Sequence, residues 1–315
     1  MIKPFWFPVV KPPNTLCMKH MHRIFITLAC TFIISGTQAQ ADDAAETGLP
    51  GDHFSLSGAL HMFKQFDNPE AFEKAINQEN NYVNNLDLNN DGQTDYIRVI
   101  NEKDGNIMLF ILRVDVSESE SQDIAVIELE KTGDKSAAIQ IIGDEDIYGE
   151  KKIVEPDEAS TAMLEPGLFG HTDPLLNGPS GNFTEANPPV FVNVWLWPSV
   201  RFVFAPGYRP WVSPWRWGRY PGWWSPWRPI GYARWRPLMM PYNRTFVVVN
   251  TRRCVRGPVV YTPHRRTSVI VRTRYAAPMG VYRSRTTVIK GPRNNKVIIR
   301  KGRVKQPIRG RGRNF

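Results

Sequence analysis

The stretch DLNNDGQTD is the clearest chemical pattern in the sequence. A glycine stands at its position 6, and oxygen-bearing side chains stand at positions 1, 3, 5 and 9, which are Asp87, Asn89, Asp91 and Asp95. A Ca²⁺ ion takes about six to eight oxygen ligands from a chain that wraps around it. We therefore expect these four side chains and the backbone carbonyl of Gln93 to bind a structural Ca²⁺ ion.

This stretch has three alternative interpretations: an EF-hand, another known type of calcium loop, and a turn that binds no ion. An EF-hand needs a bidentate acid at position 12, where this chain has Arg98, and flanking helices, whereas the residues after Asp95 read as a strand. The spacing is closer to the D-x-[DN]-x-D-G-x-x-D loops that precede strands in integrin-type propeller blades. Asn, Asp and Gly also form ordinary turns, but three carboxylates within nine residues repel one another without a cation.

A second acidic cluster, Asp144-Glu145-Asp146, follows the last expected strand of the acidic half. It is compatible with a second ion site, with a docking site for the basic tail, or with a solvated turn. The sequence carries no H-E-x-x-H, G-x-S-x-G or P-loop signature. We therefore expect a protein that is not an enzyme, with a hydrolase that uses an unrecognised carboxylate site as the third alternative.

Charge divides the chain into two halves. All 30 acidic residues lie between Asp42 and Glu185, where 9 basic residues leave a formal charge of −21. Residues 186–315 carry 27 Lys and Arg and no acid, a formal charge of +27. An asymmetry of this size predicts two units with different partners, and the two halves can also attract each other.

The first 41 residues resemble a leader. Basic residues from Lys19 to Arg23 precede an apolar run of 11 residues, and Ala39-Gln40-Ala41 forms a small-x-small cleavage site. The apolar run is shorter than the roughly 20 residues that cross a bilayer. We interpret residues 1–17 as a mis-called extension and residues 18–41 as a signal peptide. The expected location is the periplasm, the cell envelope or the medium.

The acidic half has the pattern of an α+β domain. Ser55 and Asn68 each suit the cap of a short helix, so two N-terminal helices are expected. Strand-like runs joined by short polar turns predict an antiparallel meander sheet that these helices pack on. The runs lie at 95–101, 107–116, 124–131 and 137–142.

The basic half begins with an aromatic segment. It holds 9 of the 10 tryptophans, and its many prolines oppose regular helices and central strands. Indole rings beside arginine suit a membrane interface, a glycan or single-stranded nucleic acid, although the rings can also pack internally. The expected surface-binding residues are Trp211, Trp215, Arg216, Trp217, Arg219, Trp223, Trp224, Trp227 and Arg228.

Valine and isoleucine alternate with arginine after residue 245, so we expect a basic tail that forms strands or orders on a polyanion. The tail ends in an RG-rich run, and Arg309, Arg311 and Arg313 complete the expected binding set. The whole division is: linker 42–52, acidic calcium-loop α+β domain 53–158, linker 159–188, irregular Trp/Pro/Arg-rich segment 189–244, and basic β-prone tail 245–315.

Five motifs carry a family resemblance. DLNNDGQTDYIR, QDIAVIELEK, GDEDIYG, NVWLWPSV and WVSPW together resemble an uncharacterised family of exported bacterial envelope proteins, over most of residues 53–235. The resemblance implies export and the domain layout, and it implies no reaction.

The resulting hypothesis is an exported, non-enzymatic envelope protein. Calcium stabilises one half, and the other half binds an anionic partner such as lipopolysaccharide, a glycan or a membrane. A nucleic-acid-binding protein that uses the Arg-rich tail is the second reading.

Overall fold

The computed structural model describes residues 46–157, 191–290 and 296–300. These residues fall within one compact unit, Ala45–Phe315. The predicted extension and signal peptide (1–41), the linker 159–188 and the RG-rich end lie outside the described residues.

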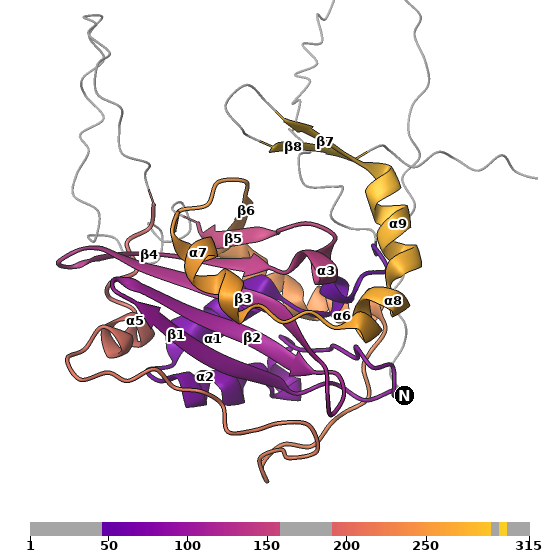
Figure 1. Cartoon of the computed structure of the whole chain (residues 1–315), viewed down its shortest axis with the longest axis horizontal. Coiled ribbons are helices and arrows are strands. Elements are labelled where there is room, and N and C mark those ends of the chain that lie inside the picture. Colours follow the sequence, from indigo (N-terminus) through magenta and orange to yellow (C-terminus); the bar gives the residue numbers. More distant parts are fainter. Residues whose placement is uncertain (1–45, 158–190, 291–295, 301–315) are drawn as a thin grey trace, which may run out of the picture. The chain divides into compact units, whose positions relative to one another are not determined.

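A six-stranded antiparallel sheet organises the unit, with its strands adjacent in sequence order (Figure 1). This confirms the predicted α+β class and the antiparallel sheet. The strands are β1 (Ile97–Asp104), β2 (Ile107–Asp115), β3 (Ser121–Gly133), β4 (Ser136–Gly143), β5 (Ile153–Pro156) and β6 (Phe246–Val249). A separate hairpin pairs β7 (Thr286–Lys290) with β8 (Lys296–Arg300).

Two helices precede the sheet and begin at the predicted caps. The Ser55 hydroxyl accepts a hydrogen bond from the Gly58 N–H at the start of α1 (Leu56–Gln65). The Asn68 side chain accepts one from the Ala71 N–H at the start of α2 (Pro69–Ile76). These caps satisfy amides that the first helical turn leaves without partners.

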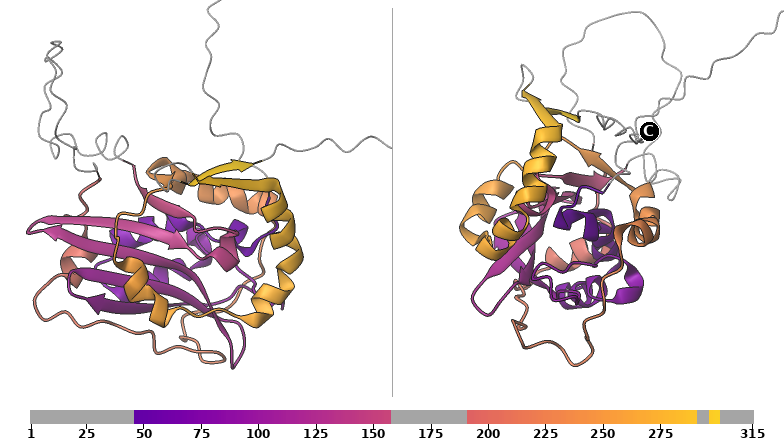
Figure 2. Two further views of the ribbon diagram at one scale, coloured as in Figure 1. Left: turned by 45° about the horizontal axis from the view of Figure 1, so that its top comes forward. Right: turned by 90° about the vertical axis from the view of Figure 1, so that its right-hand side faces the viewer.

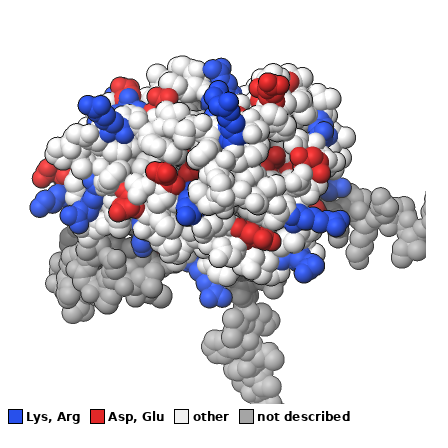
Figure 3. All heavy atoms as spheres, turned by 90° about the horizontal axis from the view of Figure 1, so that it is seen from below, with Lys and Arg blue, Asp and Glu red and all other residues white. Residues whose placement is uncertain are grey.

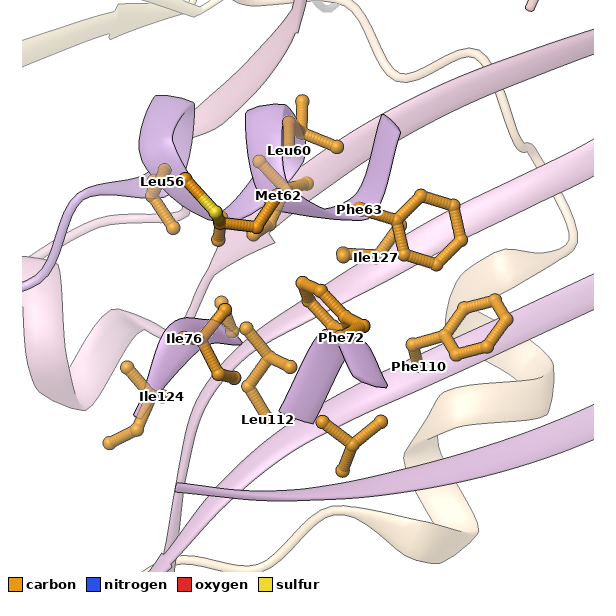
Figure 4. Close-up of a cluster of buried hydrophobic side chains, with 14 of the residues drawn as sticks. Leu56, Leu60, Met62, Phe63, Phe72, Ile76, Phe110, Leu112, Ile124 and Ile127 are labelled. Carbon is orange, nitrogen blue, oxygen red and sulfur yellow. The ribbon is translucent and has the colours of Figure 1, made fainter. Parts of the chain in front are cut away.

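Both helices pack on one face of the sheet. The Phe63 ring of α1 lies edge-on to Phe72 of α2 at 5.3 Å and to Phe110 of β2 at 4.8 Å. Figure 4 shows these rings among the aliphatic side chains of the core. Such edge-to-face pairs add about 0.5–1.5 kcal/mol each to the area that they bury.

Most helices follow the first four strands, which the sequence analysis did not predict. They are α3 (Glu145–Tyr148), α5 (Pro198–Val203), α6 (Tyr232–Met239), α7 (Gly257–Tyr261), α8 (Val269–Arg274) and α9 (Ala276–Arg285). The prediction of an irregular segment at 189–244 is wrong where α5 and α6 form, and α5 starts with proline at its first position, where a helix tolerates it. Short 3₁₀ turns lie at η2 (Pro50–His53), η3 (Glu79–Asn81), η4 (Met240–Arg244) and η5 (Thr262–His264). Among the described residues, no helix combines the length and apolar character that a bilayer crossing needs.

The prediction of a β-prone tail is wrong for residues 257–285, because α7, α8 and α9 form there. The Ser268 hydroxyl accepts the Val271 N–H and starts α8, and Val271 is fully buried in the main core. Tertiary packing and a cap outweigh the β propensity of this valine-rich run. The neighbouring runs at 286–290 and 296–300 do form strands.

The sheet is buried on both faces because β2 is apolar on both. Met108, Phe110 and Leu112 face α1 and α2, whereas Ile107, Leu109 and Ile111 join a second cluster. Cys254, with Val260 and Tyr261 of α7, covers this second cluster. Figures 1 and 2 show α7 on the opposite side of the sheet from α1 and α2.

The basic half also completes both edges of the sheet. At one edge, β6 pairs with β5 in antiparallel register. At the other edge, the Asn101 N–H of β1 donates to the Trp211 carbonyl at 2.9 Å, and the Ser213 N–H donates to the Val99 carbonyl at 3.0 Å. The two halves that charge separates in the sequence are thus one folded unit.

Candidate calcium loop and aromatic ledge

The predicted calcium loop lies between η3 and β1 and is shaped by its own amides. The Asp87 carboxylate accepts hydrogen bonds from the N–H groups of Asp91 at 3.1 Å and Gly92 at 2.9 Å. Asn90 and Gly92 have φ angles of 58° and 82°. These left-handed conformations suit Asn and Gly, and they turn the second half of the loop back toward the first.

The middle of the loop continues the same pattern. The Asn89 side-chain oxygen accepts the Asp91 N–H at 3.0 Å, and one Asp91 carboxylate oxygen accepts the Gln93 N–H at 2.8 Å. The Asn89 amide also donates to the other Asp91 oxygen at 3.0 Å. The structure therefore brings three of the predicted ligands into one turn, and Gln93 is exposed at its end.

Asp95 closes the loop from the buried side. Its carboxylate accepts the Leu88 N–H at 2.5 Å and is 7% exposed. Burial, together with the charges of Asp87 and Asp91, raises the pKa of Asp95 to about 8. A hard cation would stabilise a buried carboxylate that two neighbouring carboxylates repel, so Ca²⁺ binding at this loop stays a prediction with a stated physical reason.

Within the described ranges, no three His, Cys, Asp or Glu side chains converge as a ready metal cluster. The calcium prediction therefore rests on the loop spacing, its turns and the surroundings of Asp95. Amide and carbonyl oxygens, such as those of Asn89 and Gln93, would complete the shell.

Two distant segments hold the loop in place. On one side, the Thr94 N–H donates to the Trp227 carbonyl at 2.8 Å. On the other side, Arg274 donates to the Leu88 carbonyl at 2.8 Å, and the Tyr275 hydroxyl donates to the Asp87 carbonyl at 3.3 Å. The loop thus connects the aromatic segment with the junction of α8 and α9.

Residues 215–228, which we call the aromatic ledge, lie beside the calcium loop. Trp224 is its buried centre, with ring centroids 5.0 Å from Tyr96 and 4.7 Å from Tyr220. Around it, Trp217 is 37% exposed, Tyr220 38% and Trp223 44%. The Lys74 ammonium lies 5.4 Å from the Trp223 ring centroid, within the range of a cation–π contact.

The first part of the ledge is anchored to β1 and β2. Arg98 donates to the Trp215 carbonyl at 2.9 Å and pairs with Asp115 at 2.8 Å. The other Asp115 oxygen accepts the Trp217 N–H at 3.0 Å. Because the backbone is held in this way, the exposed rings extend from a fixed base.

The predicted surface-binding residues fall into four groups. Trp224 is buried, and Trp211, Trp215 and Trp227 are half-buried. Trp217, Trp223, Arg216, Arg219 and Arg228 are exposed. Arg309, Arg311 and Arg313 lie outside the described residues. Acidic and basic side chains are interspersed on the face seen in Figure 3.

Specific ion pairs join the acidic and basic halves. From the sequence we expected only a general attraction between them. Arg252 forms a two-point contact with Glu128, Arg253 with Glu155, and Arg265 with Asp144. The Glu128 side chain is fully buried in its pair. The opposite formal charges of the halves were the signal for these pairs.

The second acidic cluster receives the basic tail. Arg265 contacts Asp144, Glu145 and Asp146, and Arg272 contacts Asp146 at 3.1 Å. The Asp144 carboxylate also accepts the Asp146 N–H at the start of α3. Of the three readings of this cluster, these contacts match a docking site for the tail.

Glu73 of α2 is a buried residue that the sequence analysis missed. Its carboxylate accepts hydrogen bonds from the Tyr96 hydroxyl at 2.7 Å, the Val99 N–H at 2.6 Å and the Ser213 hydroxyl at 2.9 Å. Burial raises its pKa to about 7, against the opposing effect of these bonds and of Arg98. The available signal was the four-residue spacing on the expected helix. Glu73 and Asn77 directly follow the apolar residues Phe72 and Ile76, so they lie beside its buried face.

No protein-family model, curated protein or solved structure matches this chain.

Proposed function

We propose that this chain is an exported, non-enzymatic protein of the cell envelope that binds lipopolysaccharide through the aromatic ledge. The observation that carries the proposal is the position of Trp217, Tyr220 and Trp223, which remain exposed on an anchored backbone. Arg216, Arg219 and Arg228 accompany them, are exposed, and form no ion pair with any described residue.

The chemistry of the ledge suits a surface that is anionic and also partly apolar. An arginine guanidinium presents donors that match a phosphate or carboxylate in two-point contacts. Indole and phenol rings bury apolar area while their polar edges stay in contact with water. Lipopolysaccharide offers phosphates, sugars and acyl chains side by side, so it can satisfy both kinds of group.

Calcium enters this proposal as a structural ion. Bound at Asp87, Asn89, Asp91, Gln93 and Asp95, it would fix the loop whose Thr94 N–H holds the Trp227 carbonyl. Extracellular calcium sites bind at about 10⁻⁴–10⁻³ M. Calcium at such levels would therefore order the far end of the ledge.

Two alternatives remain as competing hypotheses. Single-stranded nucleic acid also combines stacking with phosphate contacts, and this reading gives the RG-rich end a role. For the hydrolase reading, the buried carboxylates Glu73, Asp123 and Glu128 are candidates. Each of them already accepts hydrogen bonds from this chain, which favours a structural role.

The test is binding of residues 42–315 to lipopolysaccharide and, in parallel, to single-stranded DNA. We expect Trp217→Ala with Trp223→Ala, or Arg216→Ala with Arg219→Ala, to weaken lipopolysaccharide binding at least tenfold. The matched control is Arg283→Ala with Arg285→Ala on α9, since both side chains are exposed. Equal losses in the ledge and control variants would reject the ledge as the binding surface. A clear preference for DNA would replace this proposal with the nucleic-acid reading.

A further inference from the structure

A second candidate site is an open pocket of about 550 Å³ whose lining shares no residue with the ledge. The start of α2 forms one wall, and the segment that leads from α5 to the edge of β1 forms the other. Its principal lining residues are Asn68, Pro69, Glu70, Phe202, Tyr208 and Trp211. The volume falls within the roughly 300–1,000 Å³ that is usual for small-ligand sites.

The aromatic wall of this pocket is held by β1. The Tyr208 hydroxyl donates to the Asn101 side-chain oxygen at 2.8 Å, and the Asn101 N–H donates to the Trp211 carbonyl at 2.9 Å. The Phe202 ring lies edge-on to Tyr208, with centroids 5.5 Å apart. Phe202 is nevertheless 41% exposed, so one apolar ring is fixed and open to a ligand.

Two charged side chains of opposite sign line the same pocket. Glu70 of α2 and Arg209 are both exposed, and neither forms an ion pair with any described residue. Glu70 can only accept hydrogen bonds when it is ionised, and Arg209 can only donate them. Together they give the pocket no net charge, in contrast to the arginines of the ledge.

We propose that this pocket binds a neutral oligosaccharide. The C–H face of a sugar ring can pack on an aromatic ring such as Phe202, and sugar hydroxyls both donate and accept hydrogen bonds. One sugar can therefore satisfy Glu70 and Arg209 at the same time. A proline-rich peptide also suits aromatic grooves, but proline has no N–H, so such a peptide offers mainly carbonyl acceptors and leaves Glu70 without a donor.

This inference does not depend on the proposed function, because the pocket and the ledge share no residue. The sugar site should be insensitive to salt, since its ligand is neutral. Lipopolysaccharide binding at the ledge should weaken as salt rises. Failure of one proposal is therefore distinguishable from failure of the other.

The experiment titrates residues 42–315 with maltotetraose, cellotetraose and chitotetraose, followed by calorimetry and by tryptophan fluorescence. We expect at least one of these sugars to bind with equal affinity at low and high salt. Glu70→Ala, Arg209→Ala and Phe202→Ala should each weaken that binding about tenfold, as expected when one hydrogen-bond or stacking partner is lost. The control is Arg201→Ala, an exposed α5 residue that does not line the pocket.

Three results would overturn the proposal. The first is the absence of binding for all three sugars. The second is binding that persists unchanged in the Glu70, Arg209 and Phe202 variants. The third is that a proline-rich decapeptide binds with the expected dependence on these residues while the sugars do not, which would assign the pocket to a peptide.

Discussion

The backbone N–H of Thr94 donates a hydrogen bond to the carbonyl oxygen of Trp227 over 2.8 Å. Thr94 belongs to the candidate calcium loop, and Trp227 lies in the last part of the aromatic ledge. Two residues beyond the ledge, the Asn85 side chain exchanges two hydrogen bonds with the backbone of Ile230 at 2.8 and 2.9 Å. A backbone hydrogen bond therefore connects the candidate ion site directly to the candidate binding surface.

Calcium should stabilise the chain through this loop. At millimolar calcium, a site with a Kd of about 10⁻⁴–10⁻³ M adds roughly 0.5–1.5 kcal/mol to the free energy of unfolding. We expect calcium to raise the Tm of residues 42–315 by a few degrees relative to chelator. Asp91→Ala should abolish this difference, and Asp134→Ala, in the β3–β4 turn, should preserve it. Identical melting in calcium and chelator would reject the ion site.

Stability should depend on the ionisation of Glu73. The folded-state pKa of about 7 is higher than the ordinary value of 4.5, so between these values the folded chain holds a proton that the unfolded chain has released. This contribution is fully present below about pH 4.5 and is lost as pH rises through about 7. Its size is roughly 3 kcal/mol, from about 1.4 kcal/mol for each unit.

The measurement for Glu73 is urea unfolding from pH 4.5 to 8 in saturating calcium, with Glu73→Gln as the comparison. The native chain should lose stability relative to this variant as pH rises, because the amide cannot ionise. Parallel pH profiles for the two proteins would show that Glu73 titrates normally. Glu70→Gln, one turn earlier on α2 and exposed, is the matched control.

The pair of Arg252 and Glu128 should contribute strongly to the free energy of unfolding. The Glu128 side chain is fully buried, and burial raises its pKa against the effect of Arg252. Arg252→Ala leaves that carboxylate without its partner, which typically costs about 3–5 kcal/mol. The matched control is Arg256→Ala, because the Arg256–Asp104 pair is 66% and 49% exposed and such pairs contribute at most about 1 kcal/mol. Similar losses in the two variants, measured by urea unfolding, would contradict this assignment.

The acidic half should not fold on its own. Without the basic half, the sheet face that carries Leu109 and Ile111 would lose the cover of Cys254 and α7. We expect residues 46–157 to bind a hydrophobic dye and to aggregate, because a large exposed apolar patch is an aggregation liability. A cooperative melting transition of this fragment near that of the longer chain would show that the acidic half is an autonomous domain.

Local sequence signals predicted the parts of the fold that local interactions determine. The caps at Ser55 and Asn68 and the short polar turn between the runs at 95–101 and 107–116 are readable from a few adjacent residues, and the structure has all three features. The turn geometry of the calcium loop was predictable for the same reason.

Long-range pairing accounts for what the sequence analysis did not predict. β6 joins β5 across nearly 90 intervening residues, and the helical conformation of α8 depends on the burial of Val271 in the main core. Which tryptophans remain exposed also depends on distant contacts. Trp223 and Trp224 are adjacent and chemically identical, yet only Trp224 is buried, against Tyr96 and Tyr220.

The most direct test of the central claim compares lipopolysaccharide binding by three forms of residues 42–315 at one fixed calcium concentration. These are the native chain, Asp91→Ala, and Trp217→Ala with Trp223→Ala. A fixed calcium level keeps the lipopolysaccharide itself unchanged. We expect Asp91→Ala to weaken binding, because the loop that holds Trp227 loses its ion, and the double tryptophan variant to weaken it further. Native affinity in both variants would contradict a calcium-held ledge as the binding surface.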